Sequence, residues 1–137
     1  MNRSVPSGVK SQEMSRVRSR DTAPELLVRK LLSSRGVRYR LHRKDIPGRP
    51  DIYISRLRMA IFVNGCFWHG HECPRGRKPA TNVQFWREKI GRNVERDTAT
   101  QRALAERGIE IQVLWTCCAK DFQRVTDEVA RRYRRLT

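Results

Sequence analysis

The stretch that decides the fold of this chain is Asp51-Ile52-Tyr53-Ile54-Ser55-Arg56-Leu57-Arg58-Met59-Ala60-Ile61-Phe62-Val63. It holds two short strand-like runs, 51–54 and 59–63, whose Ile, Tyr, Phe and Val residues favour strands. The residues between the runs are mostly polar or charged, which is typical of a turn. We therefore predict a β-hairpin whose second strand is the more buried.

The segment before the hairpin has the pattern of a helix followed by a strand. Thr22 can cap a helix, Pro24 sits in its first turn, and Glu25 completes a capping box. Gly36 is placed to end this helix. Residues 37–41 then alternate between apolar and polar, which predicts a half-buried strand.

The segments after the hairpin complete the predicted architecture. Residues 81–107 are helical in pattern, with Gly91 as a candidate break, and Gly108 follows them. Residues 109–115 predict a strand, and 121–135 predict an amphipathic helix. The order helix, three strands, helix, strand, helix predicts an α/β fold with a mixed central sheet flanked by helices.

Length and charge narrow the function. The chain has 137 residues and 30 Lys or Arg against 14 Asp or Glu, a formal net charge of +16. This length fits one compact domain, which we expect over residues 21–137, preceded by a flexible arm over residues 1–20. No apolar run approaches the ~20 residues of a membrane span, and residues 1–11 lack a signal-peptide pattern, so we expect a cytoplasmic protein.

The cations point to a polyanionic partner. Of the 30 basic residues 24 are Arg, which makes bidentate contacts with phosphate. Nucleic acid is the default partner for such an excess. The alternative is a solvated, Arg-rich surface.

A group of metal-ligand side chains lies just after the hairpin. Cys66, His71 and Cys73 fall within eight residues, and Cys117 lies far downstream at the end of a predicted strand. Thiolate and imidazole are the usual ligands of structural zinc. Disulfides and buried free thiols are the alternatives, and spacing alone does not choose between Cys117 and Cys118 as the fourth ligand.

Two further residues near these motifs can carry chemistry. Asp51 follows Pro50 at a strand start, where a carboxylate would be held rigidly and could bind a divalent cation. The alternative for Asp51 is a turn-capping role. His69 lies inside the Cys/His segment and is free for other work if His71 binds the metal, although a solvated loop His is the simpler interpretation.

Several stretches of this sequence together resemble the very short patch repair (Vsr) endonucleases. The resemblance covers roughly residues 11–135, and its stretches are 20–22 with Glu25, 47–51, 62–69 with His71 and Cys73, 79–81, 85–86, 89–97 and 115–117. The densest are Phe62-Val63-Asn64-Gly65-Cys66-Phe67-Trp68-His69 and Asn93-Val94-Glu95-Arg96-Asp97.

The resemblance implies a restriction-endonuclease-like αβββαβ core with a structural zinc loop. It also implies an endonuclease that nicks the T strand 5′ of the T in a T:G mismatch, the product of 5-methylcytosine deamination. The expected substrate is double-stranded DNA, and the expected partners are mismatch-repair proteins and, functionally, a cytosine-5 methyltransferase. Because nicking one strand needs one active site, we expect a monomer.

Catalytic roles follow from the same resemblance. Asp51 matches a Mg²⁺-binding acid, and the backbone carbonyl of Val63 matches a second Mg²⁺ ligand. His69 matches the residue that activates water, which needs a base with a pKa near 7. Asp97 matches the carboxylate that orients this His, and Glu25 matches an acid near the metal-bound waters, a role compatible with helix capping.

The zinc and DNA-contact residues also carry over. Zinc ligation would fall on Cys66, His71, Cys73 and Cys117, which would select Cys117 over Cys118. The residues that match aromatic or apolar wedges entering DNA at the mismatch are Met14, Phe67, Trp68 and Trp86. For the three aromatic residues the alternative is a place in the protein core.

One position departs from the family pattern. Asn64 stands where a second His is found, and Asn can donate a hydrogen bond to phosphate but cannot carry a proton. We therefore predict that Asn64 positions a phosphate. Two other functions stay open: a zinc-braced mismatch-binding protein without catalysis, and a restriction-type endonuclease with another target.

Overall fold

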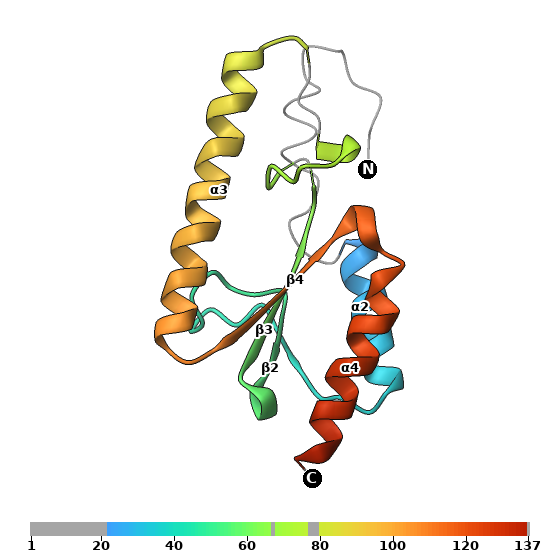
Figure 1. Ribbon diagram of the computed structural model, residues 1–137. Coiled ribbons are helices and arrows are strands. Elements are labelled where there is room, and N and C mark those ends of the chain that lie inside the picture. Colours follow the sequence, from blue (N-terminus) through green and yellow to red (C-terminus); the bar gives the residue numbers. More distant parts are fainter. Residues whose placement is uncertain (1–21, 67, 77–79, 137) are drawn as a thin grey trace.

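The computed structural model describes residues 22–66, 68–76 and 80–136, which form a four-stranded sheet with three α-helices (Figure 1). The helices are α2 (Ala23–Ser34), α3 (Val83–Glu106) and α4 (Asp121–Arg135). The strands are β1 (Arg40–Leu41), β2 (Ile52–Ile54), β3 (Met59–Asn64) and β4 (Glu110–Trp115), in spatial order β1-β2-β3-β4. The predicted mixed α/β class is confirmed.

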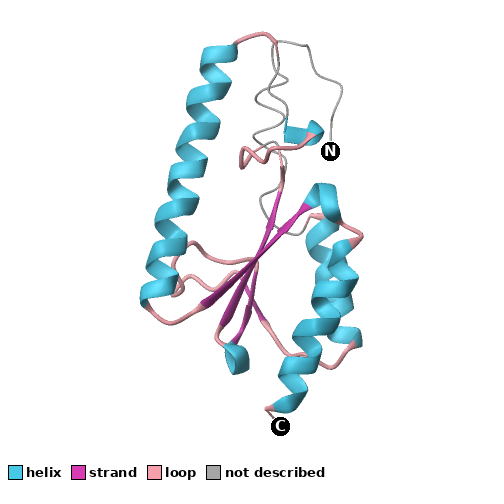
Figure 2. Cartoon of the chain, viewed as in Figure 1, coloured by secondary structure: helices cyan, strands magenta, loops and turns pink. Residues whose placement is uncertain are grey.

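The predicted hairpin forms the middle of the sheet. β2 and β3 are antiparallel, with Ile52 opposite Ile61 and Ile54 opposite Met59. Arg58 adopts a left-handed backbone, φ 49°, where the short 3₁₀ turn between the two strands ends. β3 and β4 are parallel, so the chain must cross over between them, and α3 makes this crossover (Figure 2).

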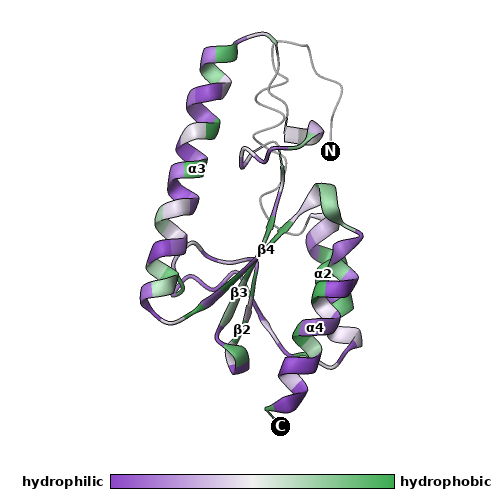
Figure 3. Ribbon diagram, viewed as in Figure 1, coloured by the Kyte–Doolittle hydropathy of each residue, from purple (hydrophilic) through white to green (hydrophobic). Residues whose placement is uncertain are grey.

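The two faces of the sheet are covered by different helices. One face presents alternate strand residues, including Ile52 and Ile61, to α2 and α4, where Leu32 and Phe122 are fully buried. On the opposite face Tyr53, Ala60 and Ile109 pack with Leu104 of α3. In Figure 3 green hydrophobic residues recur along the strands, whereas α3 and α4 alternate between hydrophilic and hydrophobic residues. Burial of each large apolar side chain stabilises the fold by about 1.5–3 kcal/mol.

Two predictions need correction. The predicted strand over 37–41 pairs only through Arg40 and Leu41, both exposed, because β2 ends at Ile54 and residues further upstream have no partner strand. Val37 instead packs into the core. α3 continues through Gly91 without a break, since one glycine disfavours a helix by only about 1 kcal/mol.

The ends of the helices follow the sequence signals. The Glu25 N–H donates to Thr22 Oγ1 at 3.4 Å, and Gly36 and Gly108 adopt the left-handed φ values that follow α2 and α3. The predicted arm, including Met14, lies outside the described residues. Among the described helices none is both long and apolar enough to cross a membrane.

Candidate active site and metal centre

Asp51 is held at the start of β2 by the neighbouring strand. The antiparallel register, continued by one residue, sets it opposite Phe62, and the N–H of the next residue, Val63, donates to Asp51 Oδ2 at 2.7 Å. Burial is the main reason that the pKa of Asp51 rises to about 7; nearby Glu25 acts in the same direction, whereas the Val63 N–H and His69 act against it. The site therefore contains a carboxyl group that a bound cation would help to ionise.

A second carboxylate approaches Asp51 from α2. Glu25 is 1% exposed, and its Oε1 lies 3.3 Å from Arg29 Nη2 and 3.5 Å from His42 Nε2. The ligand atoms of Glu25, His42 and Asp51 all lie within 4.8 Å of one another. Two carboxylates and an imidazole this close form a group that can hold a divalent cation.

Sequence reasoning missed His42. The signal that could have found it is strand register: β1 pairs Leu41 with Ile52, so the next step of the antiparallel pair sets His42 against Asp51. That register cannot be seen in the hydropathy pattern, because β1 has only two residues and both are exposed.

His69 and Asp97 form the predicted pair. His69 Nδ1 lies 2.5 Å from Asp97 Oδ2, and both side chains are about a third exposed. Asp97 comes from the middle of α3, whereas His69 belongs to the loop after β3. An Asp on Nδ1 orients the ring and leaves Nε2 available for a second partner.

Four of the five predicted catalytic residues, all but the buried Glu25, line one cleft of about 610 Å³. These four are Asp51, Asn64, His69 and Asp97. The cleft is also lined by His42 and by Val63, whose backbone carbonyl is the second predicted Mg²⁺ ligand. Its basic lining residues are Lys44, Arg49 and Arg96. Acidic and imidazole groups surrounded by cations suit a phosphodiester, since the cations attract phosphate while the other groups supply acid–base chemistry.

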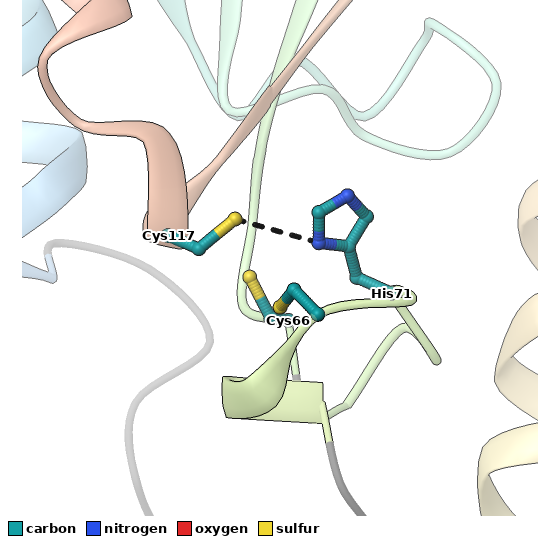
Figure 4. Close-up of side chains that lie close together, drawn as sticks. Cys66, His71 and Cys117 are labelled. Carbon is teal, nitrogen blue, oxygen red and sulfur yellow. Dashed lines mark hydrogen bonds between the residues drawn. The ribbon is translucent and has the colours of Figure 1, made fainter.

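Four of the Cys and His residues gather into a second cluster at the same end of the sheet. The ligand atoms of Cys66, His71, Cys73 and Cys117 lie within 4.8 Å of one another. Cys117 Sγ is 3.5 Å from His71 Nδ1 (Figure 4). A tetrahedral zinc would set sulfur and nitrogen ligands about 3.6 Å apart, so this donor set fits zinc.

Strand register explains why these distant residues meet. In the parallel pair Asn64 lies opposite Trp115, and Cys66 and Cys117 each follow two residues later. The loop then turns back through a hydrogen bond from the His71 N–H to the Cys66 carbonyl at 3.0 Å. Trp115 stacks on the His71 ring with centroids 4.2 Å apart.

Thiol chemistry in the cluster supports a cation. Burial raises the pKa of Cys66, but hydrogen bonds, first from Thr116, lower it to about 7. The Cys118 thiol, 3.3 Å from Cys117 Sγ, and the other nearby thiols raise the pKa of Cys117 to about 12. All four cysteines are free thiols, so the disulfide alternative is not what the structure contains. A shared Zn²⁺ would stabilise the deprotonated form of these closely spaced thiols.

The predicted DNA-contact aromatics are only partly described. Trp86 is 5% exposed and packs edge-on against Trp68, with centroids 5.8 Å apart. Phe85, which is half exposed, also packs edge-on against Trp86, with ring centroids 5.0 Å apart. Phe67 and Met14 lie outside the described residues. Trp86 is thus buried among aromatic rings here, and its contact with DNA stays a prediction.

An α/β sheet that carries a buried carboxylate and an Asp-oriented His in a basic cleft belongs to a phosphodiester-cleaving enzyme. The family described as DNA mismatch endonuclease Vsr matches residues 6–75. The chain is 48% identical to the type II nicking enzyme V.XorIIP of Xanthomonas oryzae pv. oryzae over 108 residues, 79% of each chain. It is 40% identical to the DNA mismatch endonuclease Vsr of Escherichia coli over 119 residues, 87% of this chain and 76% of the relative.

The chain therefore belongs to the Vsr DNA mismatch endonuclease family. It is a DNA endonuclease of the nicking type, and DNA is its substrate. The family resemblance seen in the sequence is confirmed.

Proposed function

We propose that this endonuclease nicks the T strand 5′ of the T in T:G mismatches that arise from 5-methylcytosine deamination. The observation that carries the proposal is the His69–Asp97 pair in the same cleft as Asp51. A relative described as a mismatch endonuclease, 40% identical to this chain, supports the mismatch target.

The residues at the start of β2 fit a catalytic Mg²⁺. Asp51 would bind it through its carboxylate, and Val63 through its backbone carbonyl. The N–H and C=O of one strand residue point to the same side, and the Val63 N–H points at Asp51, which supports this carbonyl as a second ligand. Bound Mg²⁺ would polarise the scissile phosphate and stabilise the leaving oxygen.

The protein's own groups supply the rest of the reaction. His69 accepts a proton from the attacking water on Nε2, because Asp97 engages Nδ1 and holds the ring in place. Asn64, buried at the end of β3, donates to a phosphate oxygen. Lys44, Arg49 and Arg96 contact the flanking DNA backbone. Glu25 acts on the waters around the cation.

Zinc has a structural role in this proposal. Held by Cys66, His71, Cys73 and Cys117, it would brace the loop that carries His69. The element order α2-β1-β2-β3-α3-β4 supports a restriction-endonuclease-like core over residues 21–137. The arm over 1–20, with Met14, would contact the minor groove.

Mismatch recognition would use aromatic side chains near the cleft. Trp68 and Trp86 pack on each other beside the loop that bears His69, and Phe67 lies between Cys66 and Trp68 in sequence. Insertion at a poorly stacked T:G pair is less unfavourable than at a normal pair, which would select the mismatch. The links to mismatch-repair proteins and a methyltransferase rest on the resemblance alone.

A second candidate is nicking of a different DNA target. It is favoured by two relatives described as type II nicking enzymes, V.XorIIP at 48% identity and V.NmeAIP of Neisseria meningitidis at 43%. The proposal as a whole is tested on labelled duplexes that hold a T:G or a matched pair in several flanking contexts, with and without Mg²⁺, using wild type and Asp51→Ala.

One nick beside the T, dependent on Mg²⁺ and lost in Asp51→Ala, is the expected result. Equal nicking of matched duplex would move the assignment to the second candidate. Tight mismatch binding by wild type without any nick would favour a binding protein.

A further inference from the structure

His42 lies beside two carboxylates and has no part in the reaction proposed above. The β1–β2 register brings it level with Asp51, and its side chain is 17% exposed. Its backbone is left-handed, with φ 47°, a conformation that L residues rarely adopt and that turns the chain sharply after β1.

The spacing of the cluster suits a single cation. His42 Nε2 lies 3.5 Å from Glu25 Oε1, and the ligand atoms of Glu25, His42 and Asp51 are within 4.8 Å of one another. In octahedral coordination with bonds of 2.0–2.1 Å, adjacent ligand atoms lie about 3 Å apart and opposite ones about 4 Å apart. Small side-chain shifts would bring His42 and Asp51 to one ion, with Glu25 beside them on its bound waters.

Nε2 is the ring nitrogen of His42 that faces the cluster. Arg29 Nη2 lies 3.3 Å from His42 Nε2 and 3.3 Å from Glu25 Oε1. A cation bound by the cluster would therefore meet His42 at Nε2, the atom an imidazole offers to a metal ion. Arg29 provides the positive charge at this place without a metal.

We propose that His42 is a nitrogen ligand of the divalent cation at this site and makes the site prefer a first-row transition ion to Mg²⁺. The inference rests on the proposed function in that it concerns the same cation site. Mg²⁺ takes oxygen ligands and retains water, whereas imidazole is a good ligand for transition ions. Asp51 and the Val63 carbonyl provide oxygen ligands in both cases, and Glu25 contacts the waters of the ion.

Mn²⁺ is the probe, because it is paramagnetic and binds thiolate sites weakly compared with zinc. Zinc-loaded full-length protein is titrated with Mn²⁺, and pulsed EPR detects modulation from directly coordinated ¹⁴N. We expect this modulation in wild type, its change when histidine is ¹⁵N-labelled, and its loss in His42→Gln. The matched control is His69→Gln, which removes the other imidazole of the cleft and should keep the modulation.

Competition with Mg²⁺ gives a second measurement. The Mg²⁺ concentration that displaces half of the Mn²⁺ should fall at least about ten-fold in His42→Gln, since the nitrogen ligand is lost. Zinc content and circular dichroism verify that each variant is loaded and folded. If His42→Gln does not fold, the ¹⁵N-labelled His69→Gln protein still tests the idea, because His42 is then the one cleft imidazole among the described residues.

Mn²⁺ bound to wild type without nitrogen modulation would overturn the proposal, as would modulation that disappears in His69→Gln. The nicking assay separates this inference from the proposed function. Nitrogen modulation in a protein that nicks no duplex would keep His42 as a ligand and remove the function. Nicking by a protein that shows no nitrogen modulation would keep the proposed function and remove His42 as a ligand.

Discussion

Replacing Asp51 with Asn should stabilise the folded protein at alkaline pH while abolishing Mg²⁺-dependent nicking. The reason is the burial that raises the pKa of this carboxyl from 3.8 to about 7. In the absence of a cation, ionised Asp51 therefore destabilises the folded state. Asn carries no charge and keeps an acceptor for the Val63 N–H.

The size and the sign of the effect follow from the pKa. A change from 3.8 to about 7 makes ionisation about 4 kcal/mol less favourable in the folded than in the unfolded chain. Because the folded-state value is the higher one, protonation stabilises the fold fully below about pH 4, and this contribution disappears as pH rises through 7. Between pH 6 and pH 8.5 wild type should lose about 1.4 kcal/mol relative to Asp51→Asn.

The assay is urea unfolding of zinc-loaded protein in Mg²⁺-free buffer at pH 6 and pH 8.5. The free energy of unfolding of Asp51→Asn should exceed that of wild type at pH 8.5, by up to about 4 kcal/mol. The matched control is Asp127→Asn, whose side chain is half exposed and paired with Arg35. It should show the same pH dependence as wild type.

An advantage of Asp51→Asn that is equal at the two pH values would refute the reasoning, because amide packing alone does not depend on pH. Added Mg²⁺ should stabilise wild type at pH 8.5 and leave Asp51→Asn unchanged. Equal stabilisation of both proteins would argue against Asp51 as a ligand.

Purified protein should contain about one zinc per chain, and Cys73→Ser should lower that content and the melting temperature together, as metal analysis and calorimetry will show. Gly76→Ala should lower zinc affinity, because its Cβ would lie 2.0 Å from the backbone oxygen of His71; an unchanged affinity in a metal-competition titration would contradict this. Asp97→Asn should reduce nicking about 100-fold or more and shift its pH profile, since it would leave His69 without its charged partner, whereas a change of rate with no change of profile would indicate a merely structural Asp97.

The order of the elements could be predicted because their signals are local. The hairpin of β2 and β3, the caps of α2 and the end of α3 at Gly108 each depend on a few neighbouring residues. The length of β1 could not be predicted, since it depends on where β2 ends and not on the alternation over 37–41.

Some residues of the candidate site could likewise be predicted from local sequence signals, and others could not. The spacing of Cys66, His71 and Cys73 already suggested a metal cluster, but Cys117 could be chosen only through the resemblance and then by the β3–β4 register. His42 escaped notice because its approach to Asp51 requires the pairing of a two-residue strand. Its contact with Glu25 depends on where α2 packs against the sheet, and the hydropathy pattern does not predict that position.

Because α3 continues through Gly91 without a break, it fixes the distance between residues placed along it. Trp86 and Asp97 are eleven residues apart on it, which is about 16 Å along a rigid axis. With the roles proposed above, the same rod would fix how far the mismatch contact lies from the group that orients His69. A single residue inserted between them would rotate one end by about 100° relative to the other. The length of the helix between these two residues would then determine where the nick falls relative to the mismatch. An insertion or deletion between them would misplace the cleavage site even if every functional side chain were kept.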